Sequence, residues 1–198
     1  MNPAPRRSPY EPREDEAALI RAAQGGDEPA FAELVRRYQR AVYRVGYGLT
    51  RNPADADDLA QETFVRAYRA RGRFRADEPL YPWLSRIAVN LAYSLFRRRR
   101  RRPETPIEPL VEAGHQWAGD DDPERDTADR ERHEQLQASL AELSKEHQTI
   151  LVLRVVEGLS YDEIARTIGV PVGTVMSRLS RARAELKTRL RARTGESP

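Results

Sequence analysis

The chain has 198 residues, of which 39% are hydrophobic and 33% are charged, and its formal net charge at pH 7 is +3. These values are typical of a soluble, helix-rich protein with one or two small domains, and no apolar run reaches the ~20 residues that a membrane-spanning helix needs. The absence of cysteine excludes disulfides, thiolate zinc sites and cysteine nucleophiles.

Residues 1–13 contain several prolines and no apolar segment after their arginines. We therefore expect a disordered leader and not a secretory signal. Because the chain also lacks cysteine and any membrane-spanning run, we expect a cytoplasmic protein without membrane insertion.

Residues 14–102 have the periodicity of a helical domain. A short helix is expected to end at Gly25, and a longer helix with one apolar face then begins at the N-cap Asp27. Asn52 predicts the cap of a third helix, which runs to about Gly72. A loop over 73–82 precedes a fourth helix, which six consecutive arginines, 97–102, extend until a proline ends it.

Residues 103–133 are expected to form a flexible linker. The stretch 104–134 has eleven acidic and three basic residues, a net charge of −8, so the rest of the chain carries +11. Two basic lobes joined by an acidic tether suit a polyanion that is bound at two places. A solubilising linker between ordinary domains is the simpler alternative.

A second helical domain is expected over 134–191, followed by a tail at 192–198. Ser144 predicts the cap of a helix that contains Ile150, Leu151, Leu153 and Val155 and ends at a glycine. The stretch 159–187 then predicts a helix-turn-helix. Ser160 and Glu163 have the spacing of a capping box, and Gly169 supplies a left-handed stop.

The second helix of this motif has two distinct faces. Its apolar face repeats at helical spacing: Val175, Leu179, Ala182 and Leu186. The opposite face is small and polar: Ser177, Ser180, Arg181 and Ala184. Hydroxyls and arginine suit base edges and phosphates in a major groove, although an ordinary surface helix also presents a solvated basic face.

Three stretches of the chain resemble the extracytoplasmic-function (ECF) sigma factors, the small group IV class of the sigma-70 family, to which RpoE and SigE belong. They are DDLAQETFVRAYRA at 57–70, FRAD and YPWLSRIAVN within 74–90, and GLSYDEIA and PVGTVMSRLSRAR within 158–183. Their order and spacing carry the resemblance, since a helix-turn-helix alone is shared by many regulators. The resemblance implies an all-α fold with two small helical domains, a flexible acidic linker and a C-terminal helix-turn-helix.

The resemblance also implies a bacterial transcription initiation factor that directs initiation at a stress or signal regulon. Its first domain would bind the β′ clamp of core RNA polymerase and capture the melted −10 promoter strand. Its second domain would contact the β flap and read the −35 element as duplex DNA. An anti-sigma factor is the expected regulator, and no cofactor or metal is expected.

The first domain would supply two sets of contacts. The implied polymerase contacts are Asp58, Gln61, Glu62 and Tyr68. On spacing alone, acids at the positive end of a helix are the better explanation, and the motif around them favours polymerase contacts. The implied −10 contacts are Phe74, Arg75, Tyr81, Arg86, Asn90, Ser94, Arg97 and Arg98. Aromatic rings stack on unpaired bases for about 1–3 kcal/mol per base, and a turned-out base exposes its whole Watson–Crick edge. Trp83 and Ile87 are expected in the core, which leaves Asn90, Arg86 and Phe74 as the leading candidates.

The second domain would supply the −35 contacts. The implied residues are Thr174, Met176, Ser177, Arg178, Ser180, Arg181, Arg183 and Lys187. Arg178, Arg183 and Lys187 suit phosphates, as does Thr174 beside the amides of the helix start. Some family members have arginine in place of Met176 and an aromatic residue in place of Ser180, so the resemblance does not fix the upstream sequence.

Two other classes of protein are alternatives to a sigma factor. An enzyme is not expected, because the acidic residues at 57–62 have no facing acidic cluster in a helical setting and the three histidines lack metal-ligand spacing. A stand-alone helix-turn-helix regulator, with a helical N-terminal sensing or dimerisation domain, remains the alternative. Such a regulator would bind palindromic duplex sites by itself.

Overall fold

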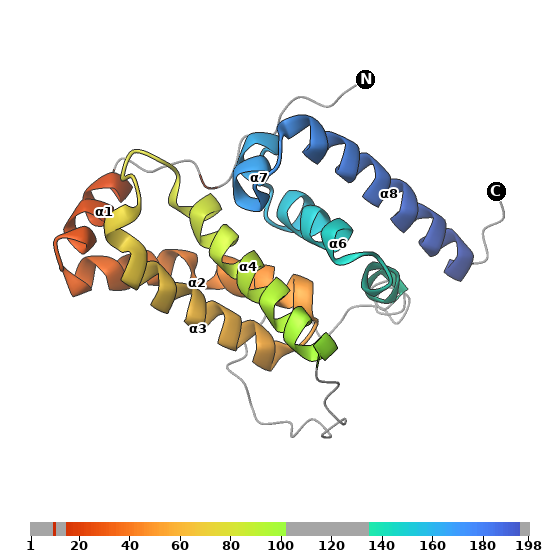
Figure 1. Ribbon diagram of the computed structural model, residues 1–198, viewed down its shortest axis with the longest axis horizontal. Helices are drawn as coiled ribbons and strands as arrows, with labels where there is room; N and C mark the ends of the chain where they lie inside the picture. Colours follow the sequence, from red (N-terminus) through yellow and green to blue (C-terminus); the bar gives the residue numbers. More distant parts are fainter. Residues whose placement is uncertain (1–9, 11–14, 102–134, 195–198) are drawn as a thin grey trace, which may run out of the picture.

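The computed structural model describes residue 10 and residues 15–101 and 135–194. The expected linker, most of the leader and the last four residues lie outside these ranges. The described residues form helices and no strand, in two helical domains (Figure 1). Within these ranges, no helix is both long enough and apolar enough to cross a membrane.

The first domain contains four α-helices and one 3₁₀ turn. They are α1 (Glu16–Gln24), α2 (Glu28–Thr50), α3 (Pro53–Ala70), η1 (Arg71–Arg73) and α4 (Leu80–Arg101). The two predicted caps are confirmed, since Asp27 accepts a hydrogen bond from the backbone N–H of Ala30 at 2.9 Å and Asn52 accepts one from that of Asp55 at 3.0 Å. Helix α3 ends slightly earlier than predicted, because η1 follows it.

Helix α4 begins at Leu80, inside the stretch that the sequence predicted to be a loop. Pro82 therefore lies in the first helical turn. Proline is tolerated there because the N–H groups of the first turn have no helical acceptor to lose. The earlier start places Tyr81 on a rigid helix and shortens the loop in front of it.

The second domain contains helical residues 135–141 and four further elements. They are α6 (Lys145–Leu151), η2 (Val152–Val156), α7 (Tyr161–Ile168) and α8 (Val172–Thr194). Ser144 caps α6 as predicted, by accepting a hydrogen bond from the backbone N–H of His147 at 3.2 Å. The continuous α-helix predicted up to Gly158 is wrong, because η2 is a π-helical turn.

The π turn changes which side chains are buried. The N–H of Glu157 bonds to the carbonyl of Val152, five residues earlier, so one extra residue enters the turn and the residues after it are rotated. Val155 and Val156 are consequently 66% and 53% exposed, whereas Glu157 is 1% exposed. The sequence had assigned Val155 to the apolar side of an ordinary helix.

The helix-turn-helix is confirmed in its details. The capping box is complete, with the N–H of Glu163 bonded to the Ser160 hydroxyl and the N–H of Ser160 bonded to the Glu163 carboxylate. Gly169 has a φ of 71°, which is the left-handed conformation that ends α7. In α8, Val175, Leu179 and Ala182 are at most 2% exposed, so the predicted apolar face is the buried one.

The capping box predicts the effect of one substitution on stability. Ser160→Ala removes a side-chain acceptor at the start of α7 and should lower the free energy of unfolding by about 1 kcal/mol. Urea denaturation followed by circular dichroism measures this change. Ser180→Ala, on the exposed face of α8, is the control and should leave the midpoint unchanged; equal midpoints for the two variants would show that the box contributes nothing.

Candidate nucleic-acid interface

The polar face of α8 is exposed along its length. Met176 is 47% exposed, and Ser177, Ser180 and Arg181 are also exposed. The guanidinium of Arg181 donates to the backbone oxygen of Ser177 at 3.3 Å, which holds it along this face. Arg183 and Lys187 extend the exposed basic surface toward the end of the helix.

Two predicted residues of α8 are less accessible. Arg178 forms an ion pair with Glu146, with 3.4 Å between Nη1 and Oε2, and its side chain is 29% exposed. A phosphate would therefore replace an existing partner of this arginine. Thr174 is half-buried in the first turn of the helix, and the N–H of its backbone bonds to the carbonyl of Pro171.

A polar stripe runs along the exposed face of α4. Arg86, Asn90 and Ser94 follow one another at intervals of four residues and are all exposed. The Ser94 hydroxyl donates to the carbonyl of Asn90 at 2.8 Å and accepts from the guanidinium of Arg97 at 2.9 Å. The stripe therefore leads from side chains that suit a base edge to the arginines at the end of the helix.

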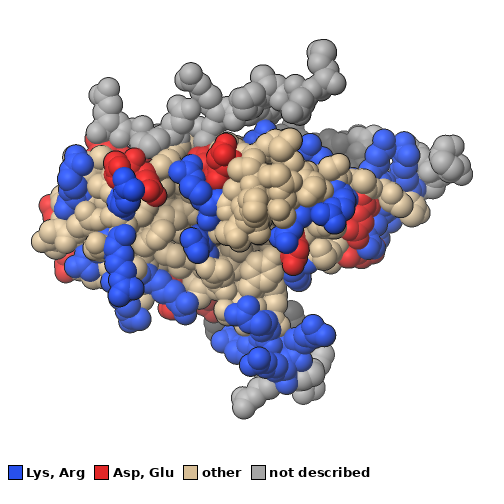
Figure 2. Space-filling view, turned by 45° about the horizontal axis from the view of Figure 1, so that its top comes forward, with Lys and Arg blue, Asp and Glu red and all other residues tan. Residues whose placement is uncertain are grey.

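The arginines at the end of α4 are not equivalent. Figure 2 shows basic side chains gathered at the lower edge of the molecule, where the end of α4 projects. Arg99 is held by Asp55 of α3 through two hydrogen bonds of 2.7 and 2.8 Å, and the Asp55 side chain is 15% exposed. Arg98 and Arg100 are exposed. Arg99 thus ties the end of α4 to α3. Arg98 and Arg100 are better placed to contact phosphates.

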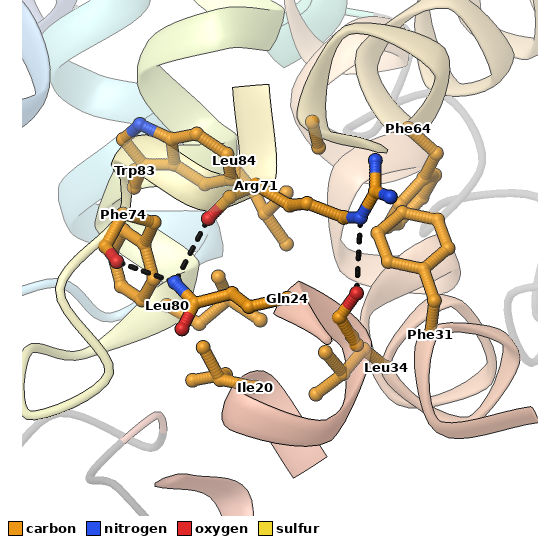
Figure 3. A pocket seen from close by; sticks show the side chains of 12 residues that line it. Ile20, Gln24, Phe31, Leu34, Phe64, Arg71, Phe74, Leu80, Trp83 and Leu84 are labelled. Atoms are coloured by element: carbon orange, nitrogen blue, oxygen red, sulfur yellow. Dashed lines mark hydrogen bonds between the residues drawn. The ribbon is translucent and has the colours of Figure 1, made fainter. Parts of the chain in front are cut away.

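Phe74 fills a pocket in the first domain and is not presented to solvent. Its side chain is 8% exposed and lies 4.9 Å from that of Trp83, measured between ring centroids. The amide of Gln24 donates to the carbonyls of Arg71 and Phe74, at 2.9 and 2.7 Å (Figure 3). The pocket has about 20 Å³ of free space, which is room for about one water and not for a base.

Tyr81 is completely buried between the domains. Its hydroxyl donates to Oε2 of Glu157 in the second domain at 2.7 Å, and burial raises its pKa well above the ordinary value. Neither Tyr81 nor Phe74 can stack on a base in this arrangement. Their roles at the −10 element stay predictions, and both roles require these rings to be uncovered.

The remaining loop residue, Arg75, is exposed and already neutralised. Its guanidinium bonds to Asp77 at 2.9 Å and lies 3.7 Å from Glu78. The hydrogen bond from Arg75 holds the pKa of Asp77 below its usual range. A phosphate at Arg75 would compete with both carboxylates.

An acidic face lies on the outer side of α3. Asp58 and Gln61 are exposed, and Glu62 is half-buried in an ion pair with Arg66 at 2.7 Å. Val65, 41% exposed, follows Gln61 by four residues and is therefore on this face. Val65 is not among the residues predicted from the sequence, although an apolar residue among charged residues is a signal that a sequence carries.

Tyr68 has a different environment from the other predicted polymerase contacts, Asp58, Gln61 and Glu62. Its ring meets Phe31 edge-on at 5.0 Å between centroids, and the guanidinium of Arg71 lies 3.9 Å above it. It is half-buried and forms part of the packing between α2 and α3. Among the described residues, no group of three or more His, Asp or Glu side chains has the arrangement of a metal site.

Comparisons with known proteins match both domains. Sigma-70 region 2 matches residues 34–102, and sigma-70 region 4 matches residues 133–186. The RNA polymerase sigma-H factor of Pseudomonas aeruginosa is 38% identical over 176 residues, which cover 86% of this chain and 91% of that protein. The ECF RNA polymerase sigma-E factor of Escherichia coli K12 is 35% identical over 177 residues, covering 87% and 92%.

Two solved structures share the fold. CnrH in complex with the cytosolic domain of CnrY superposes with a TM-score of 0.65 at 28% identity, covering 90% of this chain and 99% of that one. The sigma factor RpoE in complex with the anti-sigma factor NepR, from Bartonella quintana, gives a TM-score of 0.62 at 25% identity, covering 81% and 96%. From these matches in sequence and fold, we conclude that the chain belongs to the extracytoplasmic-function family of RNA polymerase sigma factors.

Proposed function

We propose that this transcription initiation factor uses its first domain, residues 14–102, for core RNA polymerase and the −10 strand, and its second domain, residues 134–191, for the −35 duplex. The observation that carries this proposal is the pair of exposed polar faces on α4 and α8. Each face lies in the region that matches sigma-70 region 2 or region 4, respectively. The stand-alone regulator is not favoured, because the region 2 match accounts for a first domain that the alternative would use for sensing.

The α4 stripe suits an unpaired strand. Asn90 offers both a donor and an acceptor to a base edge, and Arg86 adds donors on the same face. Arg97 and Arg98 then continue along the direction that a sugar–phosphate backbone would follow. This assignment depends on exposed side chains of a rigid helix and does not require Phe74 or Tyr81.

The α8 face suits the major groove of duplex DNA. Arg181 can donate to two acceptors of guanine, and Ser177 and Ser180 are small enough to let the helix approach the base pairs. Arg183 and Lys187 would hold phosphates on either side. The methyl group and sulfur of Met176 would give apolar contact to a thymine methyl.

The acidic face of α3 suits the polymerase. Asp58, Gln61 and Glu62 would meet a basic surface of the β′ clamp, and Val65 in place of Tyr68 would supply the central apolar contact. RNA synthesis itself would belong to the polymerase, so we expect no catalytic activity from this chain. We expect it in the cytoplasm and, within the holoenzyme, at the nucleoid.

An anti-sigma factor is the proposed regulator. The two structural relatives described above were solved as complexes, one with the cytosolic domain of CnrY and the other with the anti-sigma factor NepR. A comparable partner would compete with the polymerase for this chain.

Transcription with core RNA polymerase and a promoter library tests the proposal directly. The protein should support initiation at sites that share two non-palindromic boxes, and the starts are mapped by sequencing the transcripts. Tight binding of the free protein to palindromic duplexes, with no new starts, would favour the stand-alone regulator instead.

Arg181→Ala should weaken recognition of the upstream box by about 1–3 kcal/mol, because it removes a bidentate contact to a base. Competition binding of the holoenzyme to promoters with substituted −35 bases measures this loss. Arg189→Ala is the matched control on the same helix, since Arg189 is paired with Glu142 and Glu185 inside the domain. A similar loss for both variants would remove Arg181 from the base-reading set.

Asn90→Ala should relax selection at one position of the −10 element while the holoenzyme still assembles. The reason is that the amide would read a base edge and belongs to α4, whereas the proposed polymerase contacts belong to α3. Start-site selection on a library randomised over the −10 element measures it, with gel filtration of the holoenzyme as the assembly check. An unchanged −10 preference would show that Asn90 does not contact a base.

A further inference from the structure

The carboxylate of Glu157 is buried between the two domains and is bonded entirely across that boundary. Its side chain is 0% exposed. Arg44 of α2 donates to Oε1 at 2.9 Å and to Oε2 at 2.8 Å, and Tyr81 of α4 donates to Oε2 at 2.7 Å. Tyr10, from the N-terminal segment, donates to Oε2 at 2.6 Å. These side-chain bonds of a second-domain residue therefore all come from the first domain or the leader.

The aromatic rings around this carboxylate seal it from water. The ring of Tyr81 lies 3.7 Å from that of Tyr10 and 5.8 Å from that of Tyr38, between centroids. Burial, followed by the charge of Glu157, raises the pKa of both Tyr10 and Tyr81, so both stay neutral and keep the proton that they donate. The π turn η2 is what turns Glu157 toward these donors.

Close packing continues the contact along α2 and α4. A Cβ on Gly48 would lie 2.8 Å from a methyl carbon of Val152, so η2 rests directly on the backbone of α2. Further contacts join α4 to the second domain: Thr167 with the carbonyl of Pro82, Thr149 with Tyr93, and Lys145 with the ring of Phe96. Contact therefore extends from the first turn of α4 nearly to its arginines.

This packing is incompatible with reading both promoter elements at once. The −10 and −35 elements lie about 25 base pairs apart, which is about 85 Å along a duplex. Helix α4 has 22 residues and is only about 33 Å long, and α7 of the reading domain packs against it. The second domain must leave α4 before the two boxes can be bound together.

We propose that the free protein holds itself closed through a latch made of Glu157 with Arg44, Tyr81 and Tyr10, and that this latch opens when the protein engages polymerase and promoter. Apolar packing between the domains favours closure. The latch fixes how the domains are arranged, because any other arrangement would separate the buried carboxylate of Glu157 from one of its donors, which is energetically costly. The consequence for promoter binding rests on the proposed function, whereas closure is a property of the free chain.

Distance measurement on the free, full-length protein tests the latch. The chain contains no cysteine, so Ala54→Cys and Ala192→Cys, both at exposed positions, can be spin-labelled selectively. The parent should give one narrow distance distribution by pulsed electron paramagnetic resonance. Glu157→Gln removes the charge that Arg44 and the tyrosines surround, and should broaden and lengthen the distribution.

Glu142→Gln is the matched control, because Glu142 is paired with Arg189 and Arg193, both in its own domain. It should leave the distribution as narrow as that of the parent. A broad distribution in the parent, or the same distribution in all three proteins, would overturn the latch.

Gly48→Ala tests closure from the other side of the boundary without a change of charge. The new methyl would displace Val152, while alanine favours helix α2 itself, so the first domain should stay folded. The distribution should broaden as it does for Glu157→Gln. Gly173→Ala is the control, since a Cβ there meets no atom within 4 Å.

Affinity for core polymerase distinguishes failure of the latch from failure of the proposed function. When only a fraction of the free protein is open, the apparent Kd is the intrinsic Kd divided by that fraction, so an open population of one tenth predicts binding about tenfold tighter in Glu157→Gln. Altered distances with an unaltered Kd would overturn the link between opening and binding. If no variant binds core polymerase but the spin-label distances still change in Glu157→Gln, the proposed function is overturned and the latch is not.

Discussion

The rest of the structure depends on the packing around helix α4, because nearly every side of this helix is covered by another helix. One side completes the core of the first domain with α2 and α3, and another packs against α7 of the second domain (Figure 1). What remains is a narrow exposed stripe that contains Arg86, Asn90 and Ser94. A side chain of α4 can therefore be structural or accessible according to its angle around one helix.

The two aromatic residues predicted to contact the −10 element, Tyr81 at the start of α4 and Phe74 in front of it, are both buried. Tyr81 points toward the second domain and Phe74 points into the first, so both are covered for reasons of packing. The exposed stripe does not depend on either of them. Strand capture by Asn90 and Arg86 would be available whether the domains are together or apart, whereas any role of Tyr81 is conditional on their separation.

Local signals in the sequence were sufficient for the four helix starts that have a side-chain cap and for the helix-turn-helix, but not for the start of α4. Asp27, Asn52, Ser144 and Ser160 act over three residues, so their capping bonds follow from sequence alone. The face of α8 was also predictable, because a period of 3.6 residues assigns each position on a long amphipathic helix to one side.

The features that the sequence did not reveal depend on partners far along the chain. Glu157 is bonded to Arg44, 113 positions away, and Arg99 to Asp55, 44 positions away. A run of six arginines gives no sign of which arginine forms an ion pair with a residue of another helix. Likewise, the apolar character of Val155 and Val156 gives no sign that a π turn will expose them.

The extra residue in η2 also has a consequence for how such chains diverge. Removing one residue between positions 152 and 156 would return the segment to the ordinary helical period and rotate the next side chains by about 100°. The acidic group at 157 would then take the orientation of Val156, which is 53% exposed. In the proposed latch, a change of one residue at this site would therefore decide whether position 157 faces the first domain or the solvent.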